Sequence, residues 1–245
     1  MRNQIVILAA GKGTRMDSGD IPKVLVMLKN KPIILYVLEE IEKINQLAKP
    51  IIVVGYMYQK VREVLGDGYI YAIQDKQLGT GHALMAAKHK ASGENILVLY
   101  GDAPFVKAES LKRLMALHYA KSAKLSMFTT TAPYFDKEFS SFLYHGRIIR
   151  NSEGKIVRIT EYKDCTEEEK KIMETNPGFY MFDSAWLWSN IDKVSNKNAQ
   201  GEYYLTDMVE LAIEQGIEIQ DIPVGPHEVV SVNSLEDLKV AESLL

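Results

Sequence analysis

The chain has 245 residues, of which 47% are hydrophobic and 25% are charged, and its formal net charge is -3. This composition excludes an intrinsically disordered chain and allows a substantial core. The charge and the absence of a long basic run argue against nucleic-acid or anionic-membrane partners, which require clustered Lys and Arg.

Other features of the sequence bound its cellular setting. Cys165 is the only cysteine, so no internal disulfide can form. The apolar runs are too short to span a bilayer, and the N-terminus has no signal-peptide pattern. We therefore expect a cytoplasmic protein of one domain, while the sequence gives no indication of the oligomeric state.

Short β-branched runs alternate with helical patterns through the first half of the chain. Helical spacing predicts a helix that begins at Pro32, and similar patterns follow Gly79 and Ala108. The runs predicted to be strands are 4–9, 51–54, 69–73, 96–100 and 125–131. The alternation predicts a Rossmann-like α/β fold, with a mostly parallel central sheet and helices on both faces. Such sheets bind ligands beyond the carboxyl ends of their strands.

The pattern changes from about Phe139, where a small lobe on the main sheet is expected. Segments 147–149 and 155–160 flank the turn signal at 151–154 and predict a hairpin. The charged segment 166–171 predicts a solvated helix or loop. Later elements are expected as strands at 176–183 and 229–232 and as helices at 203–215 and 235–244.

A turn of small residues follows the first predicted strand. Gly11 and Gly13 allow backbone amides to approach phosphate oxygens, and the cations nearby can neutralise phosphate charge. Those cations are Lys12, Arg15 and Lys23. The glycine spacing fits neither the Walker pattern nor the dinucleotide fingerprint, so spacing alone leaves a phosphate loop and a generic tight turn both open.

Motifs along nearly the whole chain resemble one family. Residues 8–16, Leu-Ala-Ala-Gly-Lys-Gly-Thr-Arg-Met, and 22–25, Pro-Lys-Val-Leu, resemble the signature of sugar-nucleotidyltransferases. Gln74, the Gln-Leu-Gly-Thr-Gly-His-Ala run at 77–83 and the Tyr-Gly-Asp-Ala-Pro run at 100–104 resemble uridyltransferase domains of bacterial bifunctional uridyltransferase/acetyltransferases. Further blocks match the same domain in order, at 144–148, 161–164, 176–178 and 198–207.

This resemblance implies an Mg²⁺-dependent transfer from UTP to N-acetylglucosamine 1-phosphate without a protein nucleophile. It implies metal ligation by Asp102 and Asn233 and catalytic roles for Arg15 and Lys23. The implied nucleotide-binding residues are Leu8, Ala9, Ala10, Gly11, Gly13, Gln74, Gln77, Gly79 and Thr80. The implied sugar-binding residues are Gly101, Gly146, Glu161, Asn176 and Gly178, and Tyr203 and Tyr204 are weaker candidates for closing the pocket.

The resemblance also implies a division of the single domain, residues 1–245. A nucleotide-binding part would cover about 1–135, a β-rich sugar-binding part about 136–233, and a C-terminal helix 234–245. The left-handed β-helix acetyltransferase domain of the bifunctional enzymes does not follow in this sequence, so we expect no acetyl-CoA chemistry. A further departure is Ser231, which stands where the family has glycine before Val232 and Asn233, and it leaves metal binding there in question.

The residues alone support other interpretations of the same positions. Asp102 fits a turn before Pro104, and Asn233 fits a helix N-cap. Gln74 and Gln77 fit solvated glutamines, and His82, on an apolar helical pattern, fits a packed histidine. The alternative functions are a sugar-1-phosphate thymidylyl- or cytidylyltransferase and a nucleotide-sugar-binding protein without turnover.

Overall fold

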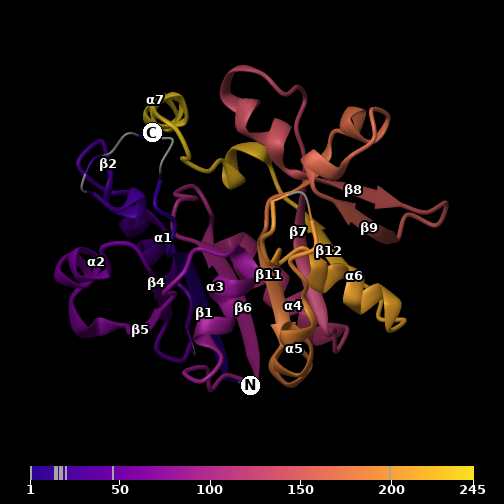
Figure 1. Cartoon of the computed structure of the whole chain (residues 1–245), viewed down its shortest axis with the longest axis horizontal. Helices are drawn as coiled ribbons and strands as arrows, with labels where there is room; N and C mark the ends of the chain where they lie inside the picture. Colours follow the sequence, from indigo (N-terminus) through magenta and orange to yellow (C-terminus); the bar gives the residue numbers. More distant parts are fainter. Residues whose placement is uncertain (1, 14–15, 17–18, 20, 46, 199) are drawn as a thin grey trace.

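A mixed sheet of ten strands runs through the molecule (Figure 1). The computed structural model describes residues 2–13, 16, 19, 21–45, 47–198 and 200–245. Across the sheet the strands stand in the order β5 (Ile70–Ile73), β4 (Ile51–Val54), β1 (Asn3–Ala9), β6 (Asn95–Tyr100), β11 (Tyr180–Asp183), β7 (Leu125–Thr131), β10 (Glu174–Asn176), β8 (Gly146–Arg150) and β9 (Ile156–Thr160), while β12 (Gln220–Pro223) pairs with β7. Strands β2 (Met27–Leu28) and β3 (Lys31–Pro32) form a separate pair.

Parallel strands form the part of the sheet built from the first half of the chain. Strand β1 pairs in parallel with β4 and β6, and β4 pairs in parallel with β5. Strand β11 then runs antiparallel between β6 and β7, and β7, β10, β8 and β9 continue in antiparallel pairs. The strands predicted in the first half of the chain and the hairpin are confirmed. The parallel central strands are those predicted, and the whole sheet is mixed because β11 runs antiparallel between β6 and β7 and the β-rich lobe adds further antiparallel pairs.

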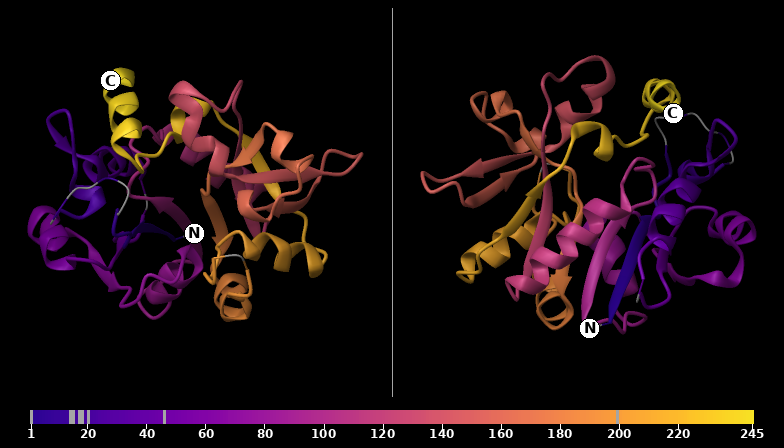
Figure 2. Two further views of the ribbon diagram at one scale, coloured as in Figure 1. Left: turned by 45° about the horizontal axis from the view of Figure 1, so that its top comes forward. Right: turned by 180° about the vertical axis from the view of Figure 1, so that it is seen from behind.

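Helices cover both faces of the sheet, as predicted, and each face has its own core. Ile5 and Ile7 of β1 face one core, while Val6 and Leu8 face the other, because side chains alternate along a strand. The first core is covered by α1 (Ile33–Glu42), α2 (Tyr58–Leu65) and α4 (Ala108–Ala120), and the second by α3 (Thr80–Ala87), α5 (Ser184–Asn190) and α6 (Asp207–Glu214). The opposite views in Figures 1 and 2 show these two layers.

Smaller elements connect these layers. Helix α7 (Leu235–Leu244) packs near β2 through a third apolar cluster that contains Leu28, Val232 and Ala241. The 3-10 helices are η2 (Lys23–Leu25), η3 (Gly66–Gly68), η4 (Lys137–Tyr144), η5 (Tyr162–Asp164), η6 (Glu169–Lys171), η7 (Ile191–Lys193) and η8 (Pro226–Val229). Among the described residues, no helix combines the length and the apolar character that crossing a membrane requires.

Three of the later predicted elements differ from the structure. The strand expected at 176–183 is two strands, because Pro177 lacks an N–H group and Gly178 has a φ of +86°. The helix expected from residue 203 begins only at Asp207, since residues 203–205 bond to the loop before α3. The strand expected at 229–232 is absent from these described residues, where Val232 donates its N–H to the carbonyl of Asp102, and strand β12 was not predicted.

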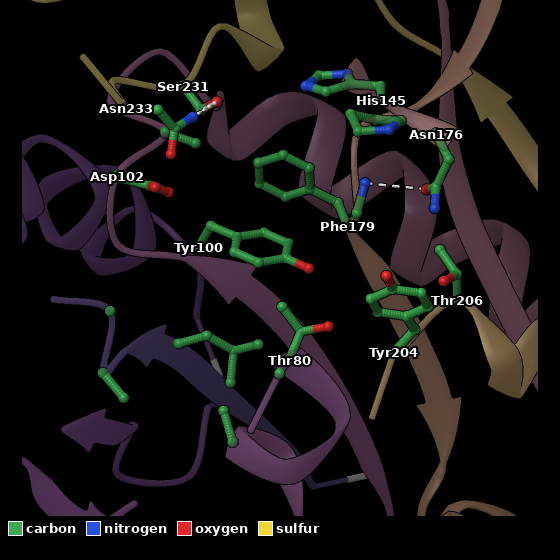
Figure 3. Close-up of a pocket in the computed structure, with 18 of the residues that line it drawn as sticks. Thr80, Tyr100, Asp102, His145, Asn176, Phe179, Tyr204, Thr206, Ser231 and Asn233 are labelled. Carbon is green, nitrogen blue, oxygen red and sulfur yellow. Dashed lines mark hydrogen bonds between the residues drawn. The ribbon is translucent and has the colours of Figure 1, made fainter. Parts of the chain in front are cut away.

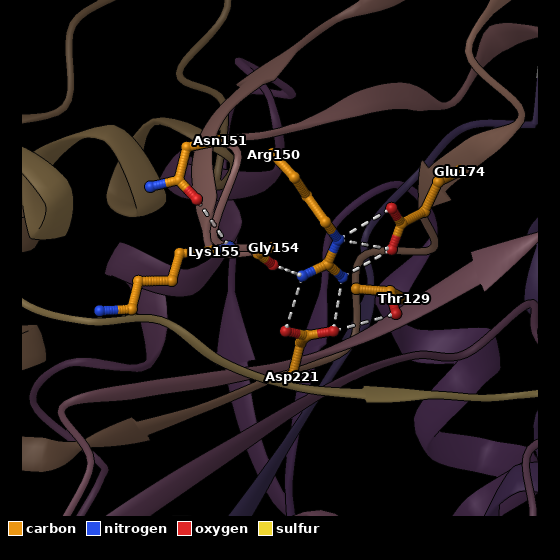
Figure 4. A network of polar contacts seen from close by, with 7 residues as sticks. All are labelled: Thr129, Arg150, Asn151, Gly154, Lys155, Glu174 and Asp221. Carbon is orange, nitrogen blue, oxygen red and sulfur yellow. Dashed lines mark hydrogen bonds and ion pairs between the residues drawn. The ribbon is translucent and has the colours of Figure 1, made fainter.

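An arginine ties the hairpin to the rest of the sheet. Arg150, at the end of β8, donates to Glu174 of β10 at 2.6 Å and to Asp221 of β12 at 2.7 Å (Figure 4). These two carboxylates raise the pKa of the Arg150 guanidinium. Bidentate pairs of this kind fix geometry, so the network holds in register the strand that begins at Gly146.

Candidate active site

A cavity of about 480 Å³ opens at the carboxyl ends of β1 and β6, a volume typical of small-molecule sites. Asp102 and Asn233 lie at one end and Asn176, Tyr204 and Thr206 at the other (Figure 3). The structure brings together in its wall fifteen of the predicted site residues, Leu8, Ala9, Ala10, Gly11, Lys23, Gln74, Gln77, Gly79, Thr80, Asp102, Gly146, Glu161, Asn176, Gly178 and Asn233.

Two predicted residues that the structure describes are not in this wall. Arg15 lies outside the described residues. Gly13 and Gly101 are described but do not line the cavity. A Cβ at Gly13 would lie 2.7 Å from Cβ of Lys23, and a Cβ at Gly101 would lie 3.1 Å from Cγ1 of Val24. Both glycines therefore allow the segment that carries Lys23 to approach the strand ends.

Lys23 joins the two predicted metal ligands. Its ammonium group forms an ion pair with Asp102 and donates to Oδ1 of Asn233 at 2.8 Å. The Asn233 amide in turn donates to the Ser231 hydroxyl at 2.8 Å, so the serine found in place of the family glycine holds Oδ1 toward Lys23. The carboxylate oxygen of Asp102 and the amide oxygen of Asn233 therefore both face the ammonium group of Lys23.

Asp102 lies in the turn after β6, as the residues alone suggested, yet it is buried, with 8% of its surface exposed. Its Oδ1 atom is buried and has no hydrogen-bond partner among the described residues. An unpartnered buried carboxylate oxygen costs free energy unless a ligand satisfies it. Because Mg²⁺ takes few protein oxygens and keeps waters and phosphate ligands, Asp102 and Asn233 fit such an ion. The described residues contain no cluster of three or more His, Cys, Asp or Glu side chains suited to a metal.

The first turn of α3 and the loop before it are hydrogen-bonded to the segment that precedes α6. Gly81 donates its N–H to the carbonyl of Tyr203, and Tyr203 donates its own to the carbonyl of Leu78, both at 2.8 Å. Leu205 donates its N–H to the hydroxyl of Thr80 at 3.0 Å. A Cβ at Gly79 would lie 2.6 Å from the Tyr203 oxygen, so this contact requires glycine. Two motifs that the sequence places far apart therefore pack as one unit.

The opposite end of the cavity combines aromatic and acidic groups. Gly178 packs against the ring of Tyr100, since a Cβ at Gly178 would lie 2.5 Å from it. Asn176 accepts from the Gly178 N–H at 2.9 Å and so forms the turn there. Glu161 accepts from the Thr206 hydroxyl at 2.8 Å. Burial raises the pKa of the Glu161 carboxyl, and burial together with Glu161 raises the pKa of the Tyr100 hydroxyl.

A buried arginine supports the wall beside Gly146. Arg147 is fully buried and donates to the backbone carbonyls of Phe142, Leu143 and His145. This arrangement fixes the loop that carries Tyr144 and His145 into the cavity wall. Burial, with the charge of Arg147, lowers the pKa of His145 to about 4, so the imidazole is neutral near pH 7.

Several wall residues were not predicted from the sequence. They are Val24, Ala83, Tyr100, Ala103, Tyr144, His145, Phe179, Tyr180, Glu202, Thr206, Val229 and Ser231. Pro177, inside the matched block 176–178, and the weaker candidate Tyr204 also line the cavity, whereas Tyr203 does not. Tyr100 could have been found, because it ends a predicted strand at the edge where ligands bind. For Thr206 the available signal was its place inside the motif 198–207.

Asp207 begins α6, directly after Thr206 of the cavity wall. Burial, together with repulsion from Glu210, Glu161 and Asp164, raises the pKa of the Asp207 carboxyl from 3.8 to about 7. The folded state therefore binds the Asp207 proton more tightly than the unfolded state does. The resulting contribution to the free energy of unfolding is fully present below about pH 4 and is lost as the pH rises through about 7. We predict that Asp207→Asn removes this loss, so the variant should gain about 1 to 2 kcal/mol over wild type at pH 8, after screening by solvent.

Urea unfolding of both proteins at pH 5 and pH 8 measures this effect. The difference between the variant and the wild type should grow with pH, because the other titrating groups are common to both. An equal difference at the two pH values would contradict the assignment to Asp207.

Comparisons with known proteins match most or all of the chain. Residues 5–156 match the family model described as the MobA-like NTP transferase domain. Over its whole length the chain is 40% identical to the Bifunctional protein GlmU of Caldicellulosiruptor saccharolyticus and 40% identical to that of Clostridium novyi. The match covers 52% of each of these proteins, so the chain spans about half the length of these curated relatives.

Solved structures share the fold at low identity. A UDP-glucose pyrophosphorylase complexed with UDP-glucose superposes with a TM-score of 0.75 at 18% identity, over 100% of this chain and 98% of that one. The inositol-1-phosphate CTP transferase from T. maritima superposes with a TM-score of 0.72 at 19% identity, over 98% and 95%. These similarities establish the Rossmann-like fold with parallel strands at its core.

Proposed function

The chain belongs to the family of MobA-like NTP transferase domains, and on this premise we propose that it forms UDP-N-acetylglucosamine and pyrophosphate from UTP and N-acetylglucosamine 1-phosphate, with Mg²⁺. The observation that carries the proposal is the cavity, whose wall combines residues that the motifs imply for the base, the sugar and the metal. The whole-chain similarity to proteins named Bifunctional protein GlmU supports the same proposal.

The proposed reaction needs positioning and charge neutralisation rather than a protein nucleophile. An oxygen of the sugar phosphate attacks the α-phosphorus of UTP in line, and the bond to the pyrophosphate oxygen breaks. Backbone amides of residues 8–11 would bind the phosphates, and Lys23 would offset charge that develops on the transferring group. Arg15 is proposed to stabilise the departing pyrophosphate.

The proposed metal role belongs to Asp102 and Asn233. Their oxygens would hold Mg²⁺, which when bound supplies polarisation of the α-phosphate. The unpartnered Oδ1 of Asp102 supports this assignment, and so does the cation that both side chains already face in Lys23.

The sugar would bind at the other end of the cavity. Glu161 would accept hydrogen bonds from sugar hydroxyls, and its neighbour Thr206 fixes the carboxylate for that purpose. Gly146 and Gly178 would border the sugar through their backbone, because a Cβ on either would collide with Ile159 or Tyr100. Gly101 remains one of the proposed sugar-site residues because of its packing against Val24, although it does not line the cavity.

A panel of four nucleoside triphosphates and several sugar 1-phosphates tests the proposal, with pyrophosphate release as the measurement. We predict UTP with N-acetylglucosamine 1-phosphate as the best pair. A clear preference for dTTP with glucose 1-phosphate would favour a thymidylyltransferase. Binding of UDP-N-acetylglucosamine without pyrophosphate release in any combination would favour a protein that only binds nucleotide sugars.

A further inference from the structure

The Gln74 side chain is held by two groups on the α3 side of the cavity wall. It is buried, with 4% of its surface exposed. Its Nε2 atom lies 3.1 Å from the carbonyl oxygen of Gly79 and 3.0 Å from Nδ1 of His82. Because a carbonyl oxygen can only accept, the Gln74 atom that faces Gly79 is the amide nitrogen. The orientation of the amide therefore follows from the bonding.

This orientation determines what the cavity offers to a ligand. The two protons on Nε2 go to Gly79 and His82, so the imidazole accepts at Nδ1 and carries its proton on the other nitrogen. Among the described residues, the Gln74 Oε1 atom accepts no hydrogen bond. Gln74 lines the cavity. Its Oε1 atom is therefore the side-chain polar atom that remains available to a bound base, and this oxygen can only accept a hydrogen bond.

An acceptor at this place distinguishes the two kinds of pyrimidine. Uracil and thymine carry a ring N–H between two carbonyl groups, while the corresponding nitrogen of cytosine is itself an acceptor. A fixed oxygen atom would accept a hydrogen bond from the ring N–H of uracil or thymine. It would repel the acceptor nitrogen of cytosine. A site built to bond a ligand N–H discriminates strongly when its buried polar group would otherwise lack a partner.

We propose that His82 is a positioning residue for base selection, which fixes the Gln74 amide so that Oε1 accepts from the ring N–H of a uracil-type base. This inference rests on the proposed function and extends it to a residue outside the cavity wall. The sequence suggested only a packed histidine, whereas the ring is partly exposed beside a shallow hollow lined by Ile73, Asp75 and Met85 among others. Replacing it therefore removes a hydrogen bond without opening a fully buried void.

Two substitutions separate the hydrogen bond from packing. His82→Leu removes the acceptor, and His82→Asn keeps an acceptor oxygen near the position of Nδ1. We expect His82→Leu to lower the ratio of kcat/KM for UTP over CTP about tenfold, mainly through a higher KM for UTP. His82→Asn should restore most of that ratio, and the KM for the sugar phosphate should stay unchanged in both.

A control comes from the same segment, where His89 is exposed just beyond α3. His89→Leu should leave the ratio unchanged. If His82→Leu melts normally and keeps the wild-type ratio, or if its kcat/KM falls equally for UTP and CTP, the proposal is overturned.

Calorimetric binding of UTP and CTP to the same proteins separates this inference from the proposed activity. Selective UTP binding that His82→Leu weakens, in a chain that releases no pyrophosphate, would refute the activity and support base selection. Wild-type protein that binds or uses UTP and CTP equally would overturn the inference even if transfer occurs.

Discussion

Asp102→Asn should reduce pyrophosphate release by about a hundredfold or more at limiting Mg²⁺. The substitution removes the anionic oxygen of the proposed metal pair and keeps the size and shape of the side chain. Loss of a charge that holds the metal at the α-phosphate would cost several kcal/mol of transition-state stabilisation, which corresponds to at least that factor. Turnover at several Mg²⁺ concentrations measures the effect.

Stability must be measured alongside this activity, because Asp102 is buried and pairs with Lys23. Lys23 keeps the Asn233 oxygen as a partner at 2.8 Å, so the variant should fold with a loss of about 1 to 2 kcal/mol. Asp192→Asn is the matched control, since this carboxylate is 66% exposed and pairs with Lys88 on the surface. It should leave turnover unchanged. Near-wild-type turnover of a normally folded Asp102→Asn protein would exclude Asp102 as the metal ligand.

Gly79→Ala should destabilise the fold by about 3 kcal/mol or more. Gly79 has φ +104° and ψ 174°, a region that is essentially restricted to glycine and costs about 1 to 3 kcal/mol for other residues. The added Cβ would also lie 2.6 Å from the Tyr203 oxygen and 2.9 Å from its nitrogen. Backbone atoms cannot turn aside as a side chain can, so this overlap should add about 1 to 3 kcal/mol.

Gly66 provides the control for this strain. Its φ of +71° and ψ of -162° lie in the same region, but a Cβ there would meet no atom within 4 Å. Gly66→Ala should therefore show the backbone cost alone. Thermal and urea unfolding of both variants give the comparison, and Gly79→Ala should melt about 6 to 12 °C below wild type. Equal stability of the two variants would mean that Tyr203 does not approach Gly79 so closely.

The parts of the fold that follow local rules could be predicted from the sequence. The short β-branched, apolar runs at 4–9 and 96–100 are a property of each strand alone, and so is the helical spacing in 235–244. The position of ligand residues after these strands followed from the sheet topology. The motif resemblance, rather than spacing, brought together Asp102 and Asn233, which are far apart in the chain and adjacent in the structure.

The rest depends on contacts that no local pattern contains. Arg147 gives no sign in the sequence that it is fully buried, because its partners are backbone carbonyls of the preceding segment. The late start of α6 depends on the bonds between residues 203–205 and 78–81. The break after β10 depends on Pro177 and Gly178, which the apolar, aromatic run at 179–182 concealed. The burial of Asp102 likewise follows from its neighbours in space.

The position of β11 has a consequence for the growing chain. Residues 95–131 supply β6 and β7 early in synthesis, but these two strands do not pair with each other, because β11 at 180–183 lies between them. Until translation reaches that point, β6 presents an open edge on its far side from β1. From the end of β6 at residue 100 to the end of β11 at residue 183, at about 5 to 20 residues per second, this interval lasts roughly 4 to 17 s. During that time the nascent protein carries an unpaired strand edge, the kind of surface on which other chains aggregate.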